Sequence, residues 1–262
     1  MRRLVLVIEY QGTHYAGFQI QPGRRTIQGE LETAIEAIVG EHVKTYGAGR
    51  TDAGTHAYGQ VVAFDTSSMY DIDVFGRGIN SKLPGDIRVI SVYQMESGFD
   101  PRRSAHSRRY RYVVLNRTNP SALWKDFSYH VAKPMDDQSM NAAAELLKGA
   151  HRHPPFSNPK VKPSHPQVIQ SATVQRMEDW IVLEIEATSF YLHQVRRIAG
   201  ALVGIGLHRI SIEDFRSLME NDYNSGAAPV LPAKGLYLAN VSYSMALDKM
   251  DVSEKRKIAN DY

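Results

Sequence analysis

One acidic side chain stands in a glycine-rich segment, residues 47–57, whose composition suits a ligand-binding loop. Asp52 is the only acid of the segment, and two basic side chains, Arg50 and His56, flank it. Glycines allow positive φ and close approach to the backbone, so a flat base or a phosphate can lie against the loop and face Asp52. The competing interpretation is an ordinary glycine-rich turn, in which Asp52 accepts a hydrogen bond from its own backbone.

The composition limits which chemistry is open to the chain. Its 262 residues include no cysteine, which excludes disulfides, thiolate catalysis and zinc held by cysteine. No Walker A or dinucleotide-type glycine pattern is present, so ATP and NAD sites are unsupported. The histidines between residues 151 and 166 are irregularly spaced with no acid nearby, which favours a solvated loop over a zinc site. We expect neither a metal nor a cofactor.

Charge and hydropathy suggest the kind of partner and compartment. The net charge of +3 is a mild basic excess that suits nucleic acid without proving it. No apolar run approaches the roughly 18 residues that span a bilayer. The N-terminus passes directly into a strand pattern rather than a signal-peptide core. We expect a soluble, cytoplasmic protein with no membrane partner.

The elements that position the loop follow a plan that the chain repeats. In the first half, helices are expected between the N-cap Thr26 and the terminator Gly40 and near residues 73–82. The strands expected there are residues 3–10, 43–46, 60–64 and 87–93. In the second half the expected helices are residues 136–147, 190–206 and 211–220, and the expected strands are residues 109–115, 169–176, 180–187 and 235–243.

This element order predicts an α+β fold. Each half resembles a split βαβ unit with a mainly antiparallel or mixed sheet and helices on one face. We expect an N-terminal α+β domain at residues 1–103 that carries the loop, a second α+β domain at 104–245, and a polar tail at 246–262. The active-site cleft is expected between the two domains.

The string at residues 47–57 resembles, nearly residue for residue, the signature loop of the tRNA pseudouridine synthase A family. Further similar stretches follow in the same order, at residues 8–12, 19–21, 26–32, 80–87, 107–112, 190–200 and 234–238. Two positions depart from the family pattern. Gln11 stands where an aspartate is usual, and Phe18 where a tryptophan is usual, which bears on substrate range more than on reaction type.

The resemblance implies a cofactor-free isomerase that converts uridine in tRNA to pseudouridine. The bond from N1 to the sugar is broken, the uracil turns, and C5 bonds to the same sugar carbon. The implied targets lie in the anticodon stem-loop, around positions 38 to 40, and the implied assembly is a homodimer that binds tRNA across both subunits. Asp52 matches the catalytic aspartate, and whether it attacks the sugar, attacks the ring or removes a sugar proton is left open.

Two residues of the second half match the family's other catalytic positions. Arg196 matches the arginine that pairs with the aspartate. The alternative is an arginine on the helix surface with no functional role. Tyr110 matches the active-site tyrosine, whose ring stacks on the uracil, a contact worth about 1 to 3 kcal/mol per base. Its phenol is a candidate for moving the C5 proton, and a core aromatic is the alternative.

Other residues are expected to bind a uridine that has been flipped out of its stem. Arg50 and His56 flank the aspartate, and Arg50 is the candidate that contacts the phosphate or flips the target nucleotide out of the stem. The remaining expected substrate-binding residues are Tyr110, Leu236, Gln21 and Arg24. Weaker candidates for phosphate contacts are Arg25, Arg108 and Arg111.

Two other functions fit parts of the sequence. The first is a noncatalytic RNA-binding protein that kept the fold, but such a protein would not need Asp52, Arg196 and Tyr110 together. A carboxylate-dependent glycoside hydrolase needs a second acid near the first, and Asp52 is alone in its loop.

Overall fold

The computed structural model describes residues 1–157, 164–221 and 228–244, so the expected polar tail lies outside the described residues. The chain divides into two compact units, Met1–His106 with Leu238–Tyr262, and Ser107–Tyr237. The domain boundary expected after residue 103 is three residues before the point where the chain passes from the first unit to the second, after His106. Among the described residues, no helix has both the length and the apolar character that crossing a membrane requires.

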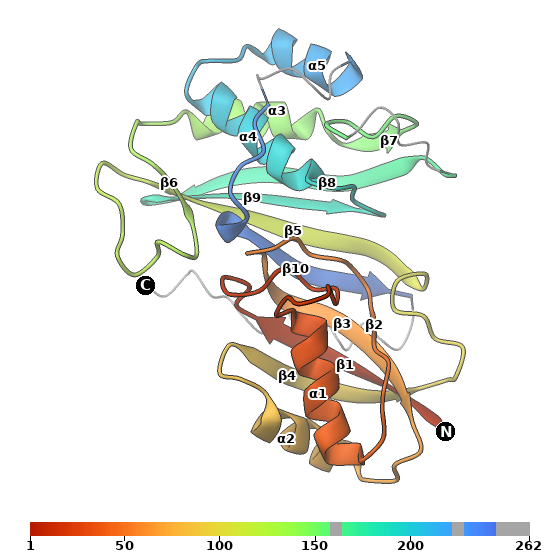
Figure 1. Cartoon of the computed structure of the whole chain (residues 1–262). Helices are drawn as coiled ribbons and strands as arrows, with labels where there is room; N and C mark the ends of the chain where they lie inside the picture. The colour runs from red at the N-terminus through yellow and green to blue at the C-terminus, as the bar shows by residue number, and fades with distance from the viewer. Residues whose placement is uncertain (158–163, 222–227, 245–262) are drawn as a thin grey trace. The chain divides into compact units, whose positions relative to one another are not determined.

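A mainly antiparallel sheet with two helices forms the first unit (Figure 1). Its strand order is β4 (Ile87–Met95), β1 (Arg2–Tyr10), β3 (His56–Thr66) and the later part of β10 (Leu236–Tyr243), with the short β2 (Tyr46–Gly47) paired to β3. β1 runs antiparallel to both β3 and β4. The helices α1 (Ile27–Val39) and α2 (Ile72–Lys82) lie on one face of this sheet.

Apolar packing on both faces fixes this sheet. The run Leu4–Ile8 of β1 is buried throughout, as its unbroken apolar sequence predicts. On the helical face α2 packs closely on β4, because a Cβ at Gly76 would lie 3.2 Å from a methyl of Val92. The segment after β4 also packs on this unit, where the ring of Phe99 lies 5.3 Å from that of Tyr243.

The ends of α1 follow the predicted caps. The side chain of Thr26 accepts a hydrogen bond from the Gly29 N–H at 3.2 Å. Gly40 adopts a left-handed backbone with φ 71°, and its N–H donates to the Glu36 carbonyl. Helix α1 therefore begins and ends where the sequence indicates.

The second unit has the same architecture. Its strand order is β5 (Ala105–Asn116), β9 (Trp180–Ala187), β8 (Gln167–Met177) and β7 (Gly149–His151), and β6 (Tyr129–Val131) pairs with β5 in parallel. The other pairings in this unit are antiparallel. Its helices are α3 (Asp137–Glu145), α4 (Gln194–Gly206) and α5 (Ile212–Asn221), followed by a short 3-10 turn, η1 (Ala233–Gly235). The α+β class with mixed, mainly antiparallel sheets is confirmed.

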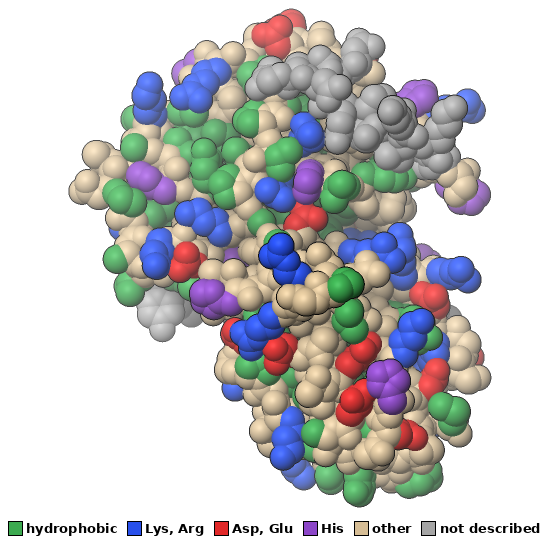
Figure 2. Space-filling view, in the orientation of Figure 1, with side chains coloured by type: hydrophobic (Ala, Val, Ile, Leu, Met, Phe, Trp, Pro, Cys, Tyr) green, Lys and Arg blue, Asp and Glu red, His purple; other side chains and the backbone are tan. Residues whose placement is uncertain are grey.

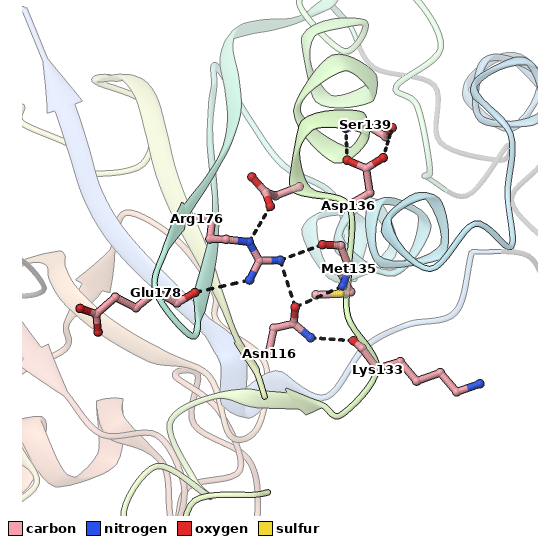
Figure 3. Close-up of polar contacts among 8 residues, drawn as sticks. Asn116, Lys133, Met135, Asp136, Ser139, Arg176 and Glu178 are labelled. Carbon is pink, nitrogen blue, oxygen red and sulfur yellow. Dashed lines mark hydrogen bonds and ion pairs between the residues drawn. The ribbon is translucent and has the colours of Figure 1, made fainter. Parts of the chain in front are cut away.

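Arg176 ties the start of α3 to the ends of β5 and β8 (Figure 3). Its Nη2 donates to the Asn116 side chain at 3.0 Å and to the Met135 carbonyl at 2.8 Å, and its Nε pairs with Asp137. Asn116 in turn donates to the Lys133 carbonyl at 2.7 Å. This polar cluster satisfies the backbone of the segment that leads into α3.

Two expected elements differ in extent. The strand predicted at residues 43–46 is reduced to β2, because side chains of α1 take the hydrogen bonds that a ladder would use: Glu32 accepts from the Thr45 N–H, and Gln28 donates to the Thr45 carbonyl. The helix predicted from residue 190 begins only at Gln194, since the preceding His193 has φ 58°. Leu192, which falls within the predicted helix but before the observed one, is 68% exposed.

The left-handed cap of α1 gives a stability prediction. Gly40→Ala meets no steric obstacle, since no atom lies within 4 Å of the added Cβ. It forces an L side chain to positive φ, so the free energy of unfolding should fall by about 1 kcal/mol. Chemical denaturation followed by circular dichroism measures the change. Gly98→Ala is the control, because its site is equally open and has no positive φ. Equal midpoints for the two variants would contradict the assignment.

Candidate active site

The loop that carries Asp52 connects β2 to β3 and is anchored along β3. Gln60, fully buried in that strand, clamps Gly49 by donating to its carbonyl at 2.8 Å and accepting from its N–H at 3.3 Å. The Thr55 N–H donates to the Asp52 carbonyl at 3.1 Å and closes a turn. Asp52 itself is half-buried. Its backbone is therefore held in place by the loop's own hydrogen bonds.

A second segment, the opening loop of residues 11–25, packs against both sides of the Asp52 loop. On one side the Phe18 N–H donates to the Thr51 carbonyl at 3.1 Å. Gly17 has φ 100°, and a Cβ there would lie 2.7 Å from the same carbonyl oxygen. On the other side a Cβ at Gly12 would lie 1.9 Å from the Thr55 carbonyl oxygen. Only glycine fits at these two contacts.

Aromatic hydroxyls secure this arrangement. Tyr10 exchanges a hydrogen bond with the Thr51 hydroxyl at 2.7 Å, and Tyr15 donates to Asp86 at 2.5 Å. Burial raises the pKa of Tyr15, and the hydrogen bond to Asp86 raises it further. Tyr15 therefore remains a protonated donor. Arg25 lies over its ring, 4.6 Å from the centroid, and pairs with Glu30 at 2.6 Å.

The expected substrate-binding residues of the first unit fall into two groups. Arg50 and Arg24 are exposed, and their side chains make no hydrogen bond or ion pair with other residues in the described ranges. Gln21 is exposed too, but its amide donates to the Ala16 carbonyl at 2.6 Å. His56 is 2% exposed and accepts a hydrogen bond from the Gly12 N–H. Acidic and basic side chains are interspersed on the helical side of this unit (Figure 2).

Tyr110 and Tyr112 share one face of β5 but differ in their surroundings. The ring of Tyr110 meets that of Phe190 edge to face, with centroids 5.1 Å apart, and the residue is 8% exposed. The Tyr112 hydroxyl donates to the Pro232 carbonyl at 2.8 Å, and the residue is 1% exposed. Tyr112 is therefore a core residue, whereas Tyr110 lies beside the segment that enters α4.

Arg196 lies in the first turn of α4 and is half-buried. Its Nε donates to the Leu231 carbonyl at 2.6 Å, and its own carbonyl accepts from the Leu231 N–H. Its charge also acts on Tyr112, whose pKa is raised mainly by burial and is partly lowered by Arg196. The side chain is thus oriented by backbone contacts, unlike a solvated surface arginine.

A buried amide pair, which the sequence did not indicate, holds the segment around Phe190. Gln194 and Gln167 exchange hydrogen bonds at 2.9 and 3.0 Å. Gln194 also donates to the Pro155 carbonyl at 2.8 Å and accepts from the Tyr191 N–H at 3.1 Å. The pair fixes the turn that leads into α4, and so supports both Phe190 and Arg196.

The other expected residues of the second unit are engaged with the protein itself. Arg108 is buried and donates to the Thr188 carbonyl at 2.9 Å, while Arg111 pairs with Glu184 at 2.6 Å. Leu236 is buried. No group of His, Asp or Glu that could hold a metal ion occurs among the residues the structure describes.

Asp52 belongs to the first unit, and Tyr110 and Arg196 belong to the second. The second unit brings Phe190 against Tyr110 and places Arg196 close to Tyr112. The pairing of Asp52 with Arg196 stays a prediction, as do the roles of the other expected site residues.

Comparisons with known proteins point to one family. A family model described as tRNA pseudouridine synthase matches residues 6–100 and 143–244. Over 245 residues the chain is 38% identical to tRNA pseudouridine synthase A of Caulobacter vibrioides (strain NA1000 / CB15N), an alignment that covers 93% of this chain and 99% of that relative. The protein of the same name from Thermoanaerobacter sp. (strain X514) is 34% identical over 244 residues, with 93% and 100% covered.

A third relative and a solved structure complete the comparisons. The tRNA pseudouridine synthase A of Myxococcus xanthus is 36% identical over 245 residues, with 93% of this chain and 92% of the relative covered. A chain from the archaeal box H/ACA sRNP Nop10–Cbf5 complex aligns with 77% of this chain, and 44% of its own length is covered. The TM-score of 0.37 and identity of 8% make this a weak likeness.

The buried amide pair gives a stability prediction for the second unit. Gln194→Leu keeps the volume but leaves Pro155 and Tyr191 backbone groups without partners, so the free energy of unfolding should fall by about 2 kcal/mol. Urea denaturation followed by tryptophan fluorescence measures it, since both tryptophans, 124 and 180, lie in this unit. Gln170→Leu, on an exposed position of β8, should change stability by no more than about 0.5 kcal/mol. A Gln194→Leu midpoint that matches the control would show that the pair is dispensable.

Proposed function

Because the chain belongs to the tRNA pseudouridine synthase family, we propose that it isomerises uridines of the tRNA anticodon stem-loop, around positions 38 to 40, through the carboxylate of Asp52. The enzyme class is that of the family, an isomerase that acts on tRNA. The observation that carries the Asp52 assignment is the double anchoring of its loop, by Gln60 on one flank and by the opening loop on both.

An anchored carboxylate suits this reaction because the rate depends strongly on how accurately the carboxylate is placed against the reacting atoms. The bond from N1 to the sugar carbon C1′ breaks and the released N1 takes up a proton. C5 of the turned uracil bonds to C1′ and gives up its own proton. Asp52 either adds to C1′, adds to the uracil ring, or removes a sugar proton. In each case the net change is an isomerisation, which consumes no oxidant, reductant or group donor.

Arg196 is proposed as the cation that pairs with the Asp52 carboxylate. A guanidinium close to a carboxylate favours its charged form, which is the form that acts as nucleophile or base. The contact of the Arg196 Nε with the Leu231 carbonyl presets the direction of the side chain, so pairing costs less conformational entropy. Its place on a buried helix supports this role over that of a solvated charge.

Tyr110 is proposed as the residue that meets the uracil. Its ring is braced edge to face by Phe190, so it offers a rigid surface on which the base can stack. We assign its phenol to the removal of the C5 proton. Tyr112 is excluded from this role, because its hydroxyl is already donated to Pro232.

The exposed guanidinium groups of Arg50 and Arg24 are proposed to contact phosphates of the flipped nucleotide and its neighbours. Extrusion of a paired uridine costs a few kcal/mol, which such charge contacts offset. Gln21 and Leu236 are proposed to complete the substrate contacts. The cytoplasmic location and the homodimer are further proposals that rest on the family resemblance.

The Asp52 assignment predicts a selective loss of chemistry. Asp52→Asn and Asp52→Ala should abolish tritium release from tRNA labelled at C5 of uridine, while the dissociation constant for tRNA changes by less than about threefold. Asp73→Asn, an exposed acid in the first turn of α2, is the control and should release tritium at the wild-type rate. Wild-type release from the Asp52 variants would refute the mechanism. Tight tRNA binding by a wild-type protein that releases no tritium would favour a noncatalytic RNA-binding protein.

A matched pair of tyrosines tests the phenol of Tyr110. Tyr110→Phe keeps the ring contact with Phe190 and loses only the hydroxyl, so single-turnover rates should fall by about 100-fold, within the usual range for acid–base groups. The tRNA dissociation constant should stay unchanged. Tyr112→Phe loses a structural hydrogen bond of about 1 kcal/mol and should keep the wild-type rate. Equal rates for the two variants would show that the Tyr110 hydroxyl does not remove the C5 proton, and stacking would be the only role left for Tyr110.

A further inference from the structure

We infer that His56 is a positioning residue, which as a neutral acceptor fastens the opening loop to the Asp52 loop and thereby sets the place of the Asp52 carboxylate. The inference rests on the proposed role of Asp52. It differs from the substrate contact that the sequence suggested for His56. With 2% of its surface exposed, His56 offers little area to a nucleotide.

The hydrogen bond fixes the state of the imidazole. The Gly12 N–H lies 3.2 Å from His56 Nδ1, and a backbone N–H can only donate. Nδ1 must therefore carry the lone pair, so the ring is neutral with its proton on Nε2. An imidazole protonated on both nitrogens, the form that would place a positive charge against phosphate, has no acceptor at Nδ1 and would lose this contact.

The bond matters because it acts where the two loops are closest. At Gly12 there is no room for even a Cβ beside the Thr55 carbonyl oxygen, and Thr55 directly precedes His56. The opening loop is thus held at residue 12 by the His56 ring and at residue 18 by the Thr51 carbonyl. These two attachments lie on opposite sides of Asp52 in the sequence. Release of one would let the turn at Asp52 shift relative to β3.

Positioning of this kind affects the rate rather than the affinity. Displacement of a reacting group by about 1 Å costs up to roughly 100-fold in rate, whereas tRNA binding depends on many phosphate contacts that remain. His56 would therefore influence kcat while KM for tRNA stays nearly constant.

Three variants separate the Nδ1 contact from other effects of the ring. His56→Asn places Oδ1 close to the position of Nδ1 and keeps the acceptor, whereas His56→Leu removes it. His42→Leu is the control, since that histidine is exposed in the same unit. For each variant, single-turnover pseudouridine formation, the tRNA dissociation constant, and amide hydrogen exchange in residues 11–18 and 48–55 are measured well below the unfolding temperature.

For His56→Leu we expect rates about 10- to 100-fold lower, a tRNA dissociation constant within about threefold, and exchange about tenfold faster in both segments. His56→Asn should stay within about threefold of wild type in all three, as should His42→Leu. Weaker tRNA binding at an unchanged rate would make His56 a substrate contact and overturn the inference. Equal loss in His56→Asn and His56→Leu, or unchanged exchange in His56→Leu, would overturn it too.

The exchange measurement keeps this inference separate from the proposed function. If wild-type protein forms no pseudouridine on tRNA, the proposed function fails. Faster exchange in His56→Leu and wild-type exchange in His56→Asn would then still support the fastening of the two loops, and any other exchange pattern would overturn it.

Discussion

The packing of two backbones against each other, with no side chain between them, is the constraint on which the proposed site depends. The opening loop approaches the Asp52 loop so closely that a Cβ at Gly12 or Gly17 would collide with a carbonyl oxygen. Such contact is stiff, because backbone atoms have few alternative positions at that distance. It also explains the hydrogen bonds around it, since the N–H and carbonyl groups of both loops must find partners once water is excluded. Asp52 is the acid presented by this arrangement.

The second unit reaches a similar result by different means. There the Gln167–Gln194 pair satisfies polar backbone groups of the segment 188–193, as where Gln194 accepts from the Tyr191 N–H. This pair places Phe190 beside Tyr110 and starts the helix that carries Arg196. Each unit thus holds its proposed catalytic groups by a buried polar network, a device that favours one geometry over alternatives at some cost in stability.

How much of this was visible in the sequence depended on the range of the interactions. The caps of α1 were predicted, because Thr26 and Gly40 act within one helical turn. The strand predicted at residues 43–46 is longer than the strand observed there. Side chains of α1 take hydrogen bonds of its backbone, and a prediction from local propensity does not include contacts with another segment. The polar Gln60 within an apolar strand was a usable signal for the clamp on Gly49. The Gln167–Gln194 pair joins residues that are far apart in the sequence, and no local pattern marks it.

The family resemblance indicated the candidate residues, and the structure adds the surroundings of each side chain. Tyr110 and Tyr112 share one face of β5, and the ring contact of Tyr110 with Phe190 and the hydrogen bond of Tyr112 to Pro232 distinguish them. The most direct test is a crystal structure of the protein with unmodified tRNA. We predict a uridine flipped out of the anticodon stem, with the Asp52 carboxylate about 3 to 3.5 Å from its C1′, its ring or the sugar carbon that loses a proton, and a loop backbone unchanged within about 1 Å. A uridine that stays stacked in its stem, or one approached by a different acid, would contradict it.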